Sequence, residues 1–261
     1  GDEEATRRTR YATKLSQKLQ RSGLALDEAE DRLFNRDYFG MMMVELGDAD
    51  AFITGVYSKY ADTIEVAKKI IGIREGYNHF GTLHILNCKK GPFFLADTVI
   101  NRLPNTASLI DIARLTERVV KIFNYDPVMA MVSFSNFGSD KGGSPEQAHQ
   151  TVEYLHRNHP EIMIDGEMQV NFALNKELRD RKFPFNKLRG KDVNTFIFPN
   201  LSSANASYQL LQGITKAELI GPIQMGLNKP IHFTDNEATV TDIFNTIAIA
   251  VIDAMIEKNK Q

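Results

Sequence analysis

The chain has 261 residues, 43% of them hydrophobic and 25% charged, with a formal net charge of −2. This is enough apolar material for a sizeable core in one or two domains, and the near-neutral charge gives no general attraction to nucleic acid or membranes. The single cysteine, Cys88, excludes an internal disulfide and a zinc site built from cysteines. No apolar run is long enough to span a bilayer, so we expect neither a membrane nor a nucleic-acid partner.

The start of the chain bears on where the protein works. No signal-peptide pattern opens it, and it begins at Gly1 without an initiator methionine. We therefore expect a cytoplasmic protein and a piece of a longer polypeptide.

The first part of the chain is predicted to be mainly helical. Apolar residues spaced three or four positions apart predict helices over 2–20, 26–34 and 38–46. A short strand over 51–54 and a helix over 62–71 follow as a β–α unit. Ligands in open α/β sheets bind outside the carboxyl ends of strands, so the loop between this strand and helix is expected to face a ligand.

The middle of the chain predicts a mixed sheet. Two apolar runs, 82–87 and 93–98, flank a Lys-Lys-Gly-Pro turn and predict a hairpin. An amphipathic helix is expected over 106–123, followed by a buried strand over 128–134 that leads into a polar, glycine-rich loop. A hairpin beside parallel β–α units implies strands of both directions in one sheet.

Two further helices have the spacing of a capping box at their start. Ser144 with Gln147 predicts a helix from Ser144 to about 156, and Thr239 with Asp242 predicts one over 239–258. Helix capping alone is sufficient to account for an aspartate at position 242.

Two carboxylates are expected near the ligand edge of the sheet. A strand over 162–164 should deliver Asp165 and Glu167 there. Such a pair can act as acid and base, or as helix caps and ribose hydrogen-bond acceptors, and the sequence leaves both interpretations open. The six histidines show no HxxxH or HxH spacing, so no metal site is predicted.

A strand over 194–198 ends at Pro199-Asn200 and is followed by a helix opened by small polar residues, 202–205. We expect several unpaired backbone N–H groups there, available to a phosphate or carbonyl; an ordinary helix cap is the alternative. Another strand over 219–223 precedes Gly226, and glycines at a strand end permit close backbone approach. The alternating strands and helices predict an α/β fold of three layers.

Several of these segments together resemble a known family. The order IFPNL, SSANASYQLL and IGPIQMGLNKPI resembles the carboxyl-terminal half of the phosphate acetyltransferase (phosphotransacetylase) family. The run KPIHF followed by TDIFNTIAIAVIDA is similar to the form of that domain fused to the end of hybrid NADP-dependent malic enzymes. Upstream, DADAFITG, SFSNFGS and DGEMQ occur in the family order, so the resemblance extends over most of the chain.

The resemblance implies a particular domain organisation. It implies three-layer mixed and parallel sheets in two α/β domains with a cleft between them. Residues 1–77 and 228–261 would form the first domain, truncated at its amino terminus, and residues 78–227 the inserted second domain. The family's first strands have no counterpart before Asp2, so we expect the exposed side of the first domain to be covered by a partner subunit or left mobile.

The chain departs from the family where the family's chemistry is done. The resemblance implies a base that deprotonates the thiol of coenzyme A and arginines that stabilise the phosphate and the developing oxyanion. Asp242 matches the base. The remaining positions lack the expected cationic and hydroxyl groups: Glu65, Gly213, Asp235, Asn236 and, aligned less securely, Leu19. We therefore predict no catalytic residues for acetyl transfer in this chain.

The leading functional hypothesis is a non-catalytic regulatory and oligomerising domain of a malic enzyme. The resemblance implies an amino-terminal malic enzyme domain, outside this chain, that converts malate to pyruvate with NADP and a divalent metal. Acetyl-CoA is the expected effector, and the protein is expected to form at least a homodimer. The expected ligand-binding residues are Ser133, Ser135, Asn136, Gly138, Ser139, Asn205, Tyr208, Gly221, Pro222 and Gly226.

Two other functions remain open at this point. The chain could be an active phosphate acetyltransferase if other basic residues, for instance Lys59 or Lys141, bind phosphate. It could also be a purely structural dimerisation domain without a ligand.

Overall fold

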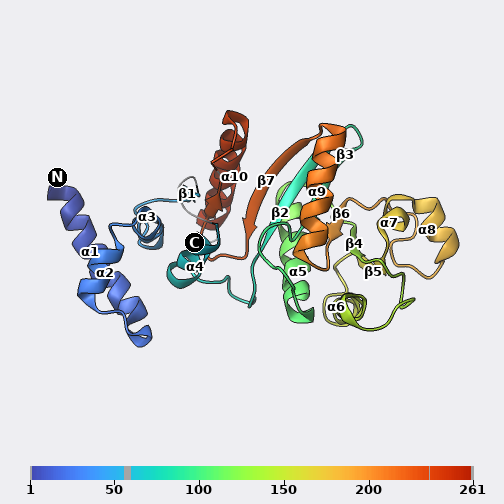
Figure 1. The fold of residues 1–261 in the computed structure, drawn as a ribbon, viewed down its shortest axis with the longest axis horizontal. Coiled ribbons are helices and arrows are strands. Elements are labelled where there is room, and N and C mark those ends of the chain that lie inside the picture. The colour runs from blue at the N-terminus through green and yellow to red at the C-terminus, as the bar shows by residue number, and fades with distance from the viewer. Residues whose placement is uncertain (1, 56–59, 235, 260–261) are drawn as a thin grey trace. The chain divides into compact units, whose positions relative to one another are not determined.

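The computed structural model describes residues 2–55, 60–234 and 236–259, so Lys59 and Asp235 lie outside the described residues. The chain divides into two compact units, residues 1–76 with 227–261 and residues 77–226, and Figure 1 traces both. We call them unit 1 and unit 2. None of the helices described has both the length and the apolar character needed to cross a membrane.

Unit 1 is mainly helical around a small sheet. Its sheet pairs β1 (Phe52–Thr54) in parallel with β8 (Ile231–Phe233), and β8 was not predicted from the sequence. The fully buried side chains of Tyr11, Leu15 and Met41 form much of its core. Its helical segments are α1 (Asp2–Leu19), the 3-10 turn η1 (Gln20–Ser22), α2 (Leu26–Arg32), α3 (Arg36–Glu45), α4 (Tyr60–Ile70) and α10 (Val240–Lys258).

Unit 2 is built on a six-stranded mixed sheet with the order β5-β4-β6-β3-β2-β7. Its strands are β2 (Gly81–Cys88), β3 (Gly91–Ala96), β4 (Met129–Val132), β5 (Ile164–Met168), β6 (Thr195–Ile197) and β7 (Glu218–Met225). Strand β2 runs antiparallel to both neighbours, and the other strands are mutually parallel. The carboxyl ends of β3, β4, β5, β6 and β7 therefore meet at one edge, where α/β sheets bind ligands.

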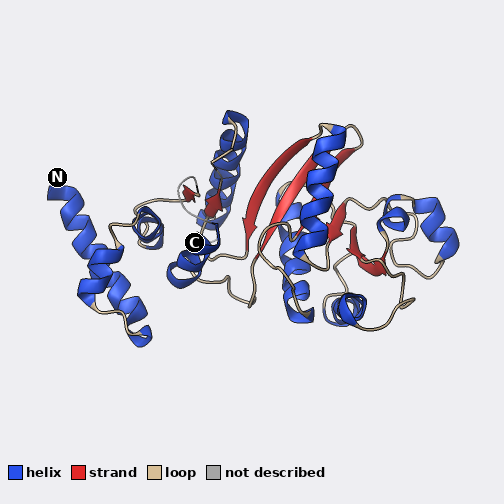
Figure 2. Cartoon of the chain, in the orientation of Figure 1, coloured by secondary structure: helices blue, strands red, loops and turns tan. Residues whose placement is uncertain are grey.

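Helices cover both faces of this sheet. The helices of unit 2 are α5 (Thr106–Ile122), α6 (Gly143–Asn158), α7 (Val170–Leu174), α8 (Lys176–Lys182) and α9 (Leu201–Thr215). Helix α5 packs against β2, β3, β6 and β7, α6 against β4 and β5, and α9 against β2 and β3. Figure 2 shows the long strands of this unit lying between helices. The three-layer α/β fold with a mixed sheet is confirmed.

Most predicted elements are present, but two local predictions are wrong and two short helices were missed. Strand β5 continues to Met168, so Asp165 and Glu167 lie inside the strand instead of beyond it. Helix α6 begins at Gly143 with Gly142 as its N-cap and no side-chain cap, so Ser144 lies inside the first turn and does not cap the helix. Helices α7 and α8 were not predicted.

Candidate functional site

The polar loop after β4 is folded around one buried carboxylate. We call residues 133–139 the β4 loop. Ser135 Oγ and the Gly138 amide donate hydrogen bonds to Glu167 Oε1, at 2.8 and 2.6 Å. The Phe137 amide donates to the main-chain carbonyl oxygen of Glu167 at 2.8 Å. The loop conformation is therefore set by a residue of the neighbouring strand β5.

A second link joins the β4 loop to the end of β5. The Asn136 amide nitrogen Nδ2 donates to Gln169 Oε1 at 3.0 Å, and the Gln169 main-chain amide donates back to Asn136 Oδ1 at 2.9 Å. Gln169 Nε2 also donates to the Phe134 carbonyl oxygen at 2.8 Å. The carboxyl ends of β4 and β5 thus form one hydrogen-bonded platform at the ligand edge of the sheet.

The five β4-loop residues predicted to bind a ligand fall into two groups. Gly138 and Ser139 are exposed and Asn136 is half-buried, whereas Ser133 and Ser135 are buried. Ser133 Oγ accepts the Ser135 amide at 3.1 Å, and Ser135 Oγ is engaged by Glu167. The Ser133 and Ser135 oxygens thus have partners inside the loop, as does Ser139 Oγ, which accepts the Asn136 amide at 2.9 Å. Ligand contact by these residues stays a prediction.

A second cluster forms where α9 crosses β2, and it includes a histidine that the sequence did not single out. The rings of His84 and Tyr208 stack with centroids 4.5 Å apart and planes inclined by 18°. Asn205 Nδ2 donates to the Tyr208 hydroxyl at 3.2 Å, and His84 Nδ1 lies 2.7 Å from Thr98 Oγ1. We call His84, Thr98, Asn205 and Tyr208 the histidine cluster. The one sequence signal for it was a histidine within a predicted buried strand.

Gly221, Pro222 and Gly226 have packing roles of their own, and their predicted ligand contacts stay predictions. A Cβ on Gly221, whose φ is +135°, would lie 2.8 Å from the Leu83 carbonyl oxygen and 2.9 Å from the His84 ring. Gly221 and Pro222 lie within β7, away from its carboxyl end, and β7 is an edge strand, where proline is tolerated. Gly226 does follow β7, but a Cβ there would lie 2.8 Å from the Leu115 side chain.

Main-chain amides at the start of α9 already have hydrogen-bond acceptors within the protein. Asn200 Oδ1 accepts the Ser203 amide at 2.9 Å, and the Leu201 amide donates to the Arg102 carbonyl oxygen at 3.2 Å. The prediction of several unpaired N–H groups at this helix start is therefore wrong, because Asn200 acts as an ordinary N-cap.

The two carboxylates of β5 do not form an acid–base pair. Asp165 Oδ2 accepts the Lys187 amide at 2.6 Å and Asp165 Oδ1 accepts the Gly166 amide at 3.0 Å, while Glu167 holds the β4 loop. Each carboxylate thus has its own structural partners. Among the residues that the structure describes, no three His, Cys, Asp or Glu side chains are placed to hold a metal ion.

Burial lowers the pKa of His84 to about 4 from its ordinary value of 6.5. Between these two pKa values the unfolded chain binds a proton at His84 that the folded chain does not bind. The unfolding free energy of the protein is therefore higher above about pH 6.5 and falls as the pH is lowered toward about 4. The shift corresponds to about 3 kcal/mol. We expect wild-type protein to lose about that much more unfolding free energy than His84→Gln between neutral pH and about pH 4.

Urea unfolding at a series of pH values measures this difference. His159→Gln, at a half-buried histidine outside the cluster, is measured at the same pH values as the control for the substitution itself. Parallel curves for wild type and His84→Gln would contradict the expectation.

Three of the positions where the resemblance implies arginines are exposed and hold no cation. Glu65 is exposed on α4, Gly213 is exposed on α9, and Asn236 is exposed before α10. Asp242 forms the predicted capping box: its Oδ2 accepts the Thr239 amide and hydroxyl at 2.8 and 2.7 Å. The aspartate at the base position is thus bound to the start of its own helix.

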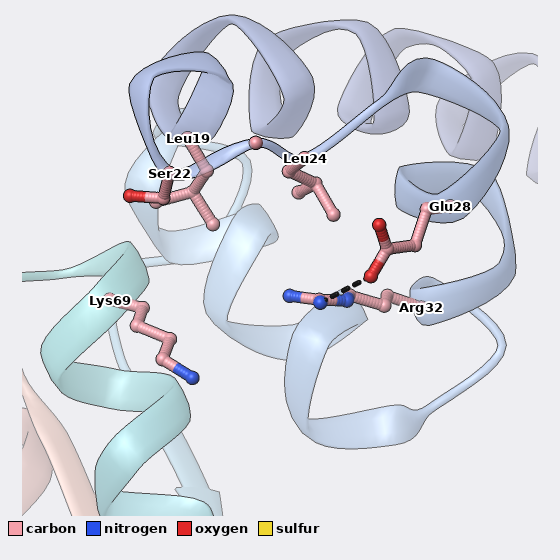
Figure 3. Close-up of a pocket in the computed structure, with 7 residues that line it drawn as sticks. Leu19, Ser22, Leu24, Glu28, Arg32 and Lys69 are labelled. Carbon is pink, nitrogen blue, oxygen red and sulfur yellow. Dashed lines mark hydrogen bonds and ion pairs between the residues drawn. The ribbon is translucent and has the colours of Figure 1, made fainter.

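Leu19 lines a small pocket of unit 1, shown in Figure 3. The pocket has a volume of about 190 Å³, and its basic residues are Arg32 and Lys69. Arg32 is paired with Glu28 at 2.5 Å, so its charge is already compensated. The pocket therefore does not rebuild an arginine clamp around Leu19.

The sequence and fold together define the family. The family model "Phosphate acetyl/butaryl transferase" matches residues 2–251, and the chain belongs to this family. The fold is shared with the EutD phosphotransacetylase from Staphylococcus aureus, with a TM-score of 0.84 and 26% identity over 95% of this chain and 75% of that chain. A phosphotransacetylase from Streptococcus pyogenes has the same TM-score, with 29% identity over 97% of this chain and 75% of that one.

Among curated relatives, both malic enzymes and acetyltransferases are similar to the chain. The NADP-dependent malic enzyme of Escherichia coli K12 is 34% identical over 95% of this chain, which spans 33% of that protein. The phosphate acetyltransferase of Bacillus subtilis is 32% identical over 90% of this chain and 73% of that protein. The predicted resemblance to both is confirmed, and the chain spans about one third of the malic enzyme's length.

Proposed function

We propose that this chain is a non-catalytic regulatory and oligomerising unit of a malic enzyme, and that it binds acetyl-CoA as an allosteric effector. The observation that carries the proposal is the family fold together with an exposed Glu65 and Gly213 at positions where the resemblance implies arginines. The similarity to the Escherichia coli NADP-dependent malic enzyme suggests the polypeptide to which such a unit belongs. That polypeptide would oxidise malate to pyruvate with NADP and a divalent metal bound outside this chain.

Two features of unit 2 support the retention of an acyl-CoA ligand. The β4 loop presents Asn136, Gly138 and Ser139 at the sheet edge, and the histidine cluster places Asn205 and Tyr208 on α9. Phe137 and Tyr208 pack against the same hydrophobic cluster, so both groups flank one face of the sheet. Polar groups beside an apolar surface suit an extended ligand with amide and apolar parts.

Regulation requires more than binding. An effector shifts an equilibrium only by the difference between its affinities for the two states of the protein. We therefore expect acetyl-CoA to bind the active and inactive arrangements of the complete malic enzyme with different affinities.

Calorimetry with acetyl-CoA tests the ligand. We expect saturable binding by the wild type and loss of at least about tenfold in affinity in Asn205→Trp, because a bulky ring there displaces the Tyr208 hydroxyl. Gln212→Trp is the matched control, as Gln212 is exposed further along α9. In the complete malic enzyme, malate oxidation should respond to acetyl-CoA in the wild type and in Gln212→Trp, and the response should be lost in Asn205→Trp.

The outcomes of that experiment separate the alternatives. Absence of binding at millimolar acetyl-CoA would favour a purely structural dimerisation unit. Binding with a persistent response in Asn205→Trp would contradict the placement of the effector at α9.

We also propose that the protein forms at least a homodimer. Large apolar side chains are exposed in both units: Phe244 and Met255 on α10 are 68% and 60% exposed, and Ile214 on α9 is 73% exposed. Contiguous exposed apolar surface is typical of interaction sites. Light scattering at micromolar protein should give at least twice the monomer mass, and Phe244→Glu or Ile214→Glu should lower it. A monomer mass at every concentration would contradict this proposal.

A further inference from the structure

We propose that Glu167 is a positioning residue of the ligand site, and that its buried carboxylate holds the β4 loop in the conformation that presents Asn136, Gly138 and Ser139. The inference rests on the proposed function, since it concerns the same ligand. It assigns a role to a side chain that the ligand itself would not touch, because Glu167 is 0% exposed.

The bonds made by Glu167 fall on the three residues that shape the loop. Its Oε1 accepts the Ser135 hydroxyl at 2.8 Å and the Gly138 amide at 2.6 Å, and its carbonyl oxygen accepts the Phe137 amide at 2.8 Å. Hydrogen bonds to a carboxylate are shorter and stronger than those between neutral groups. Glu167 therefore fixes the part of the loop in which Gly138 adopts a left-handed conformation, φ +82°.

The second carboxylate oxygen of Glu167 faces a histidine. Within the described residues, Glu167 Oε2 and His149 Nδ1 are both buried without a hydrogen-bond partner, and they lie 3.3 Å apart. His149, on α6, also approaches Glu153 Oε1 at 3.7 Å. A buried carboxylate with one unbonded oxygen is unfavourable unless a nearby group compensates it. His149 is the group placed to do so.

Through Glu167, helix α6 is linked to the β4 loop. Helix α6 packs against β4 and β5, and Glu167 extends from β5 to the β4 loop. An apolar residue in place of Glu167 would remove the burial cost, but it would release the loop. A function for the loop in binding explains why a buried carboxylate stands there.

Three variants test the inference through acetyl-CoA affinity. Glu167→Met has a similar length and no acceptor, and should weaken binding by at least about tenfold. Glu167→Gln keeps an acceptor for Ser135 and Gly138 and turns an amide toward His149, so its affinity should stay within about threefold of the wild type. Glu161→Met, at an exposed position before β5, should bind as the wild type does.

Amide hydrogen exchange of the unliganded protein supplies a readout that does not depend on the ligand. In Glu167→Met the amides of Phe137 and Gly138 should exchange faster, while those of the central strand β6 remain protected. If Glu167→Met does not fold, Ser135→Ala removes one of the two donors to Oε1. That variant should weaken binding by about threefold and speed exchange at Gly138.

The possible results discriminate clearly. Unchanged affinity in a folded Glu167→Met, or in Ser135→Ala if the former does not fold, would overturn the inference while leaving acetyl-CoA binding intact. Equal losses of affinity in Glu167→Gln and Glu167→Met, with no change in exchange, would also overturn it. If the wild type itself does not bind acetyl-CoA, the proposed function fails and the inference fails with it, whatever the exchange rates show.

Discussion

Protein supplied with acetyl phosphate and coenzyme A should form acetyl-CoA at a rate at least about 10²–10³-fold below that of an active phosphate acetyltransferase. The physical reason is the loss of charge stabilisation. Glu65 places an exposed carboxylate, and Gly213 no side chain at all, where the family resemblance implies arginines. Removing one donor that stabilises developing negative charge typically costs a factor of this size.

Asp242, at the position of the family's base, also bears on the expected rate of acetyl transfer. Asp242 Oδ2 accepts both the amide and the hydroxyl of Thr239, so one of the two carboxylate oxygens at the base position already serves the helix cap. Restoring arginine at 65 and 213 together should therefore give little recovery, because the phosphate pocket must also be shaped and dry.

A thiol-release assay measures this rate, with the phosphate acetyltransferase of Bacillus subtilis as the positive control. Turnover comparable to that enzyme would contradict the prediction and favour the active-acetyltransferase alternative. Lys141, exposed before α6, would then be the first cation to replace, since Lys59 lies outside the described residues.

The second large effect is expected on stability. Arg179→Met should lower the unfolding free energy of the protein by about 3–5 kcal/mol. The Arg179 side chain is 0% exposed, and its guanidinium donates to the carbonyl oxygens of Leu188 and Lys191 at 2.8 and 2.7 Å and to that of Ala173 at 3.4 Å. Methionine fills the space but leaves these buried carbonyls without donors.

The consequence should reach the candidate ligand site. Phe137 of the β4 loop contacts the rings of Phe183 and Phe185, with centroids 4.8 and 5.1 Å away, and both lie on the segment that Arg179 organises. Urea unfolding measures the stability change, and Arg181→Met, an exposed position on the same helix, serves as the control. A difference below about 1 kcal/mol between the two variants would contradict this account.

Local signals predicted the elements whose cause lies within a few residues. The hairpin turn between β2 and β3 pairs Cys88 with Gly91 directly, because Lys89 and Lys90 form a two-residue loop. The capping box of Thr239 and Asp242 is present for the same reason: each side chain bonds to the other's main-chain amide.

Signals of the same kind failed where neighbours in space made the choice. Ser144 has the capping spacing, but the helix starts one residue earlier, at Gly143, so Ser144 lies in the first turn and the N-cap is Gly142 without a side-chain bond. Asp165 and Glu167 were expected beyond a strand end. They instead lie within β5, since hydrogen bonding with β4 extends the pairing to Met168.

By itself, the sequence determined the family and the three-layer α/β class, because each depends on residue identities in order along the chain; the loss of the acetyl transfer arginines stays a prediction from the same resemblance. It also identified the polar β4 loop. Only the tertiary structure decided which of the predicted site residues already have partners within the protein. Ser135 is used by Glu167, Gly221 is required by the His84 ring, and Asn200 closes the start of α9. The roles of Ser135 and Gly221 depend on contacts with other segments, which residue order alone does not specify. The Asn200 cap is local, and an ordinary helix cap was the alternative that the sequence left open.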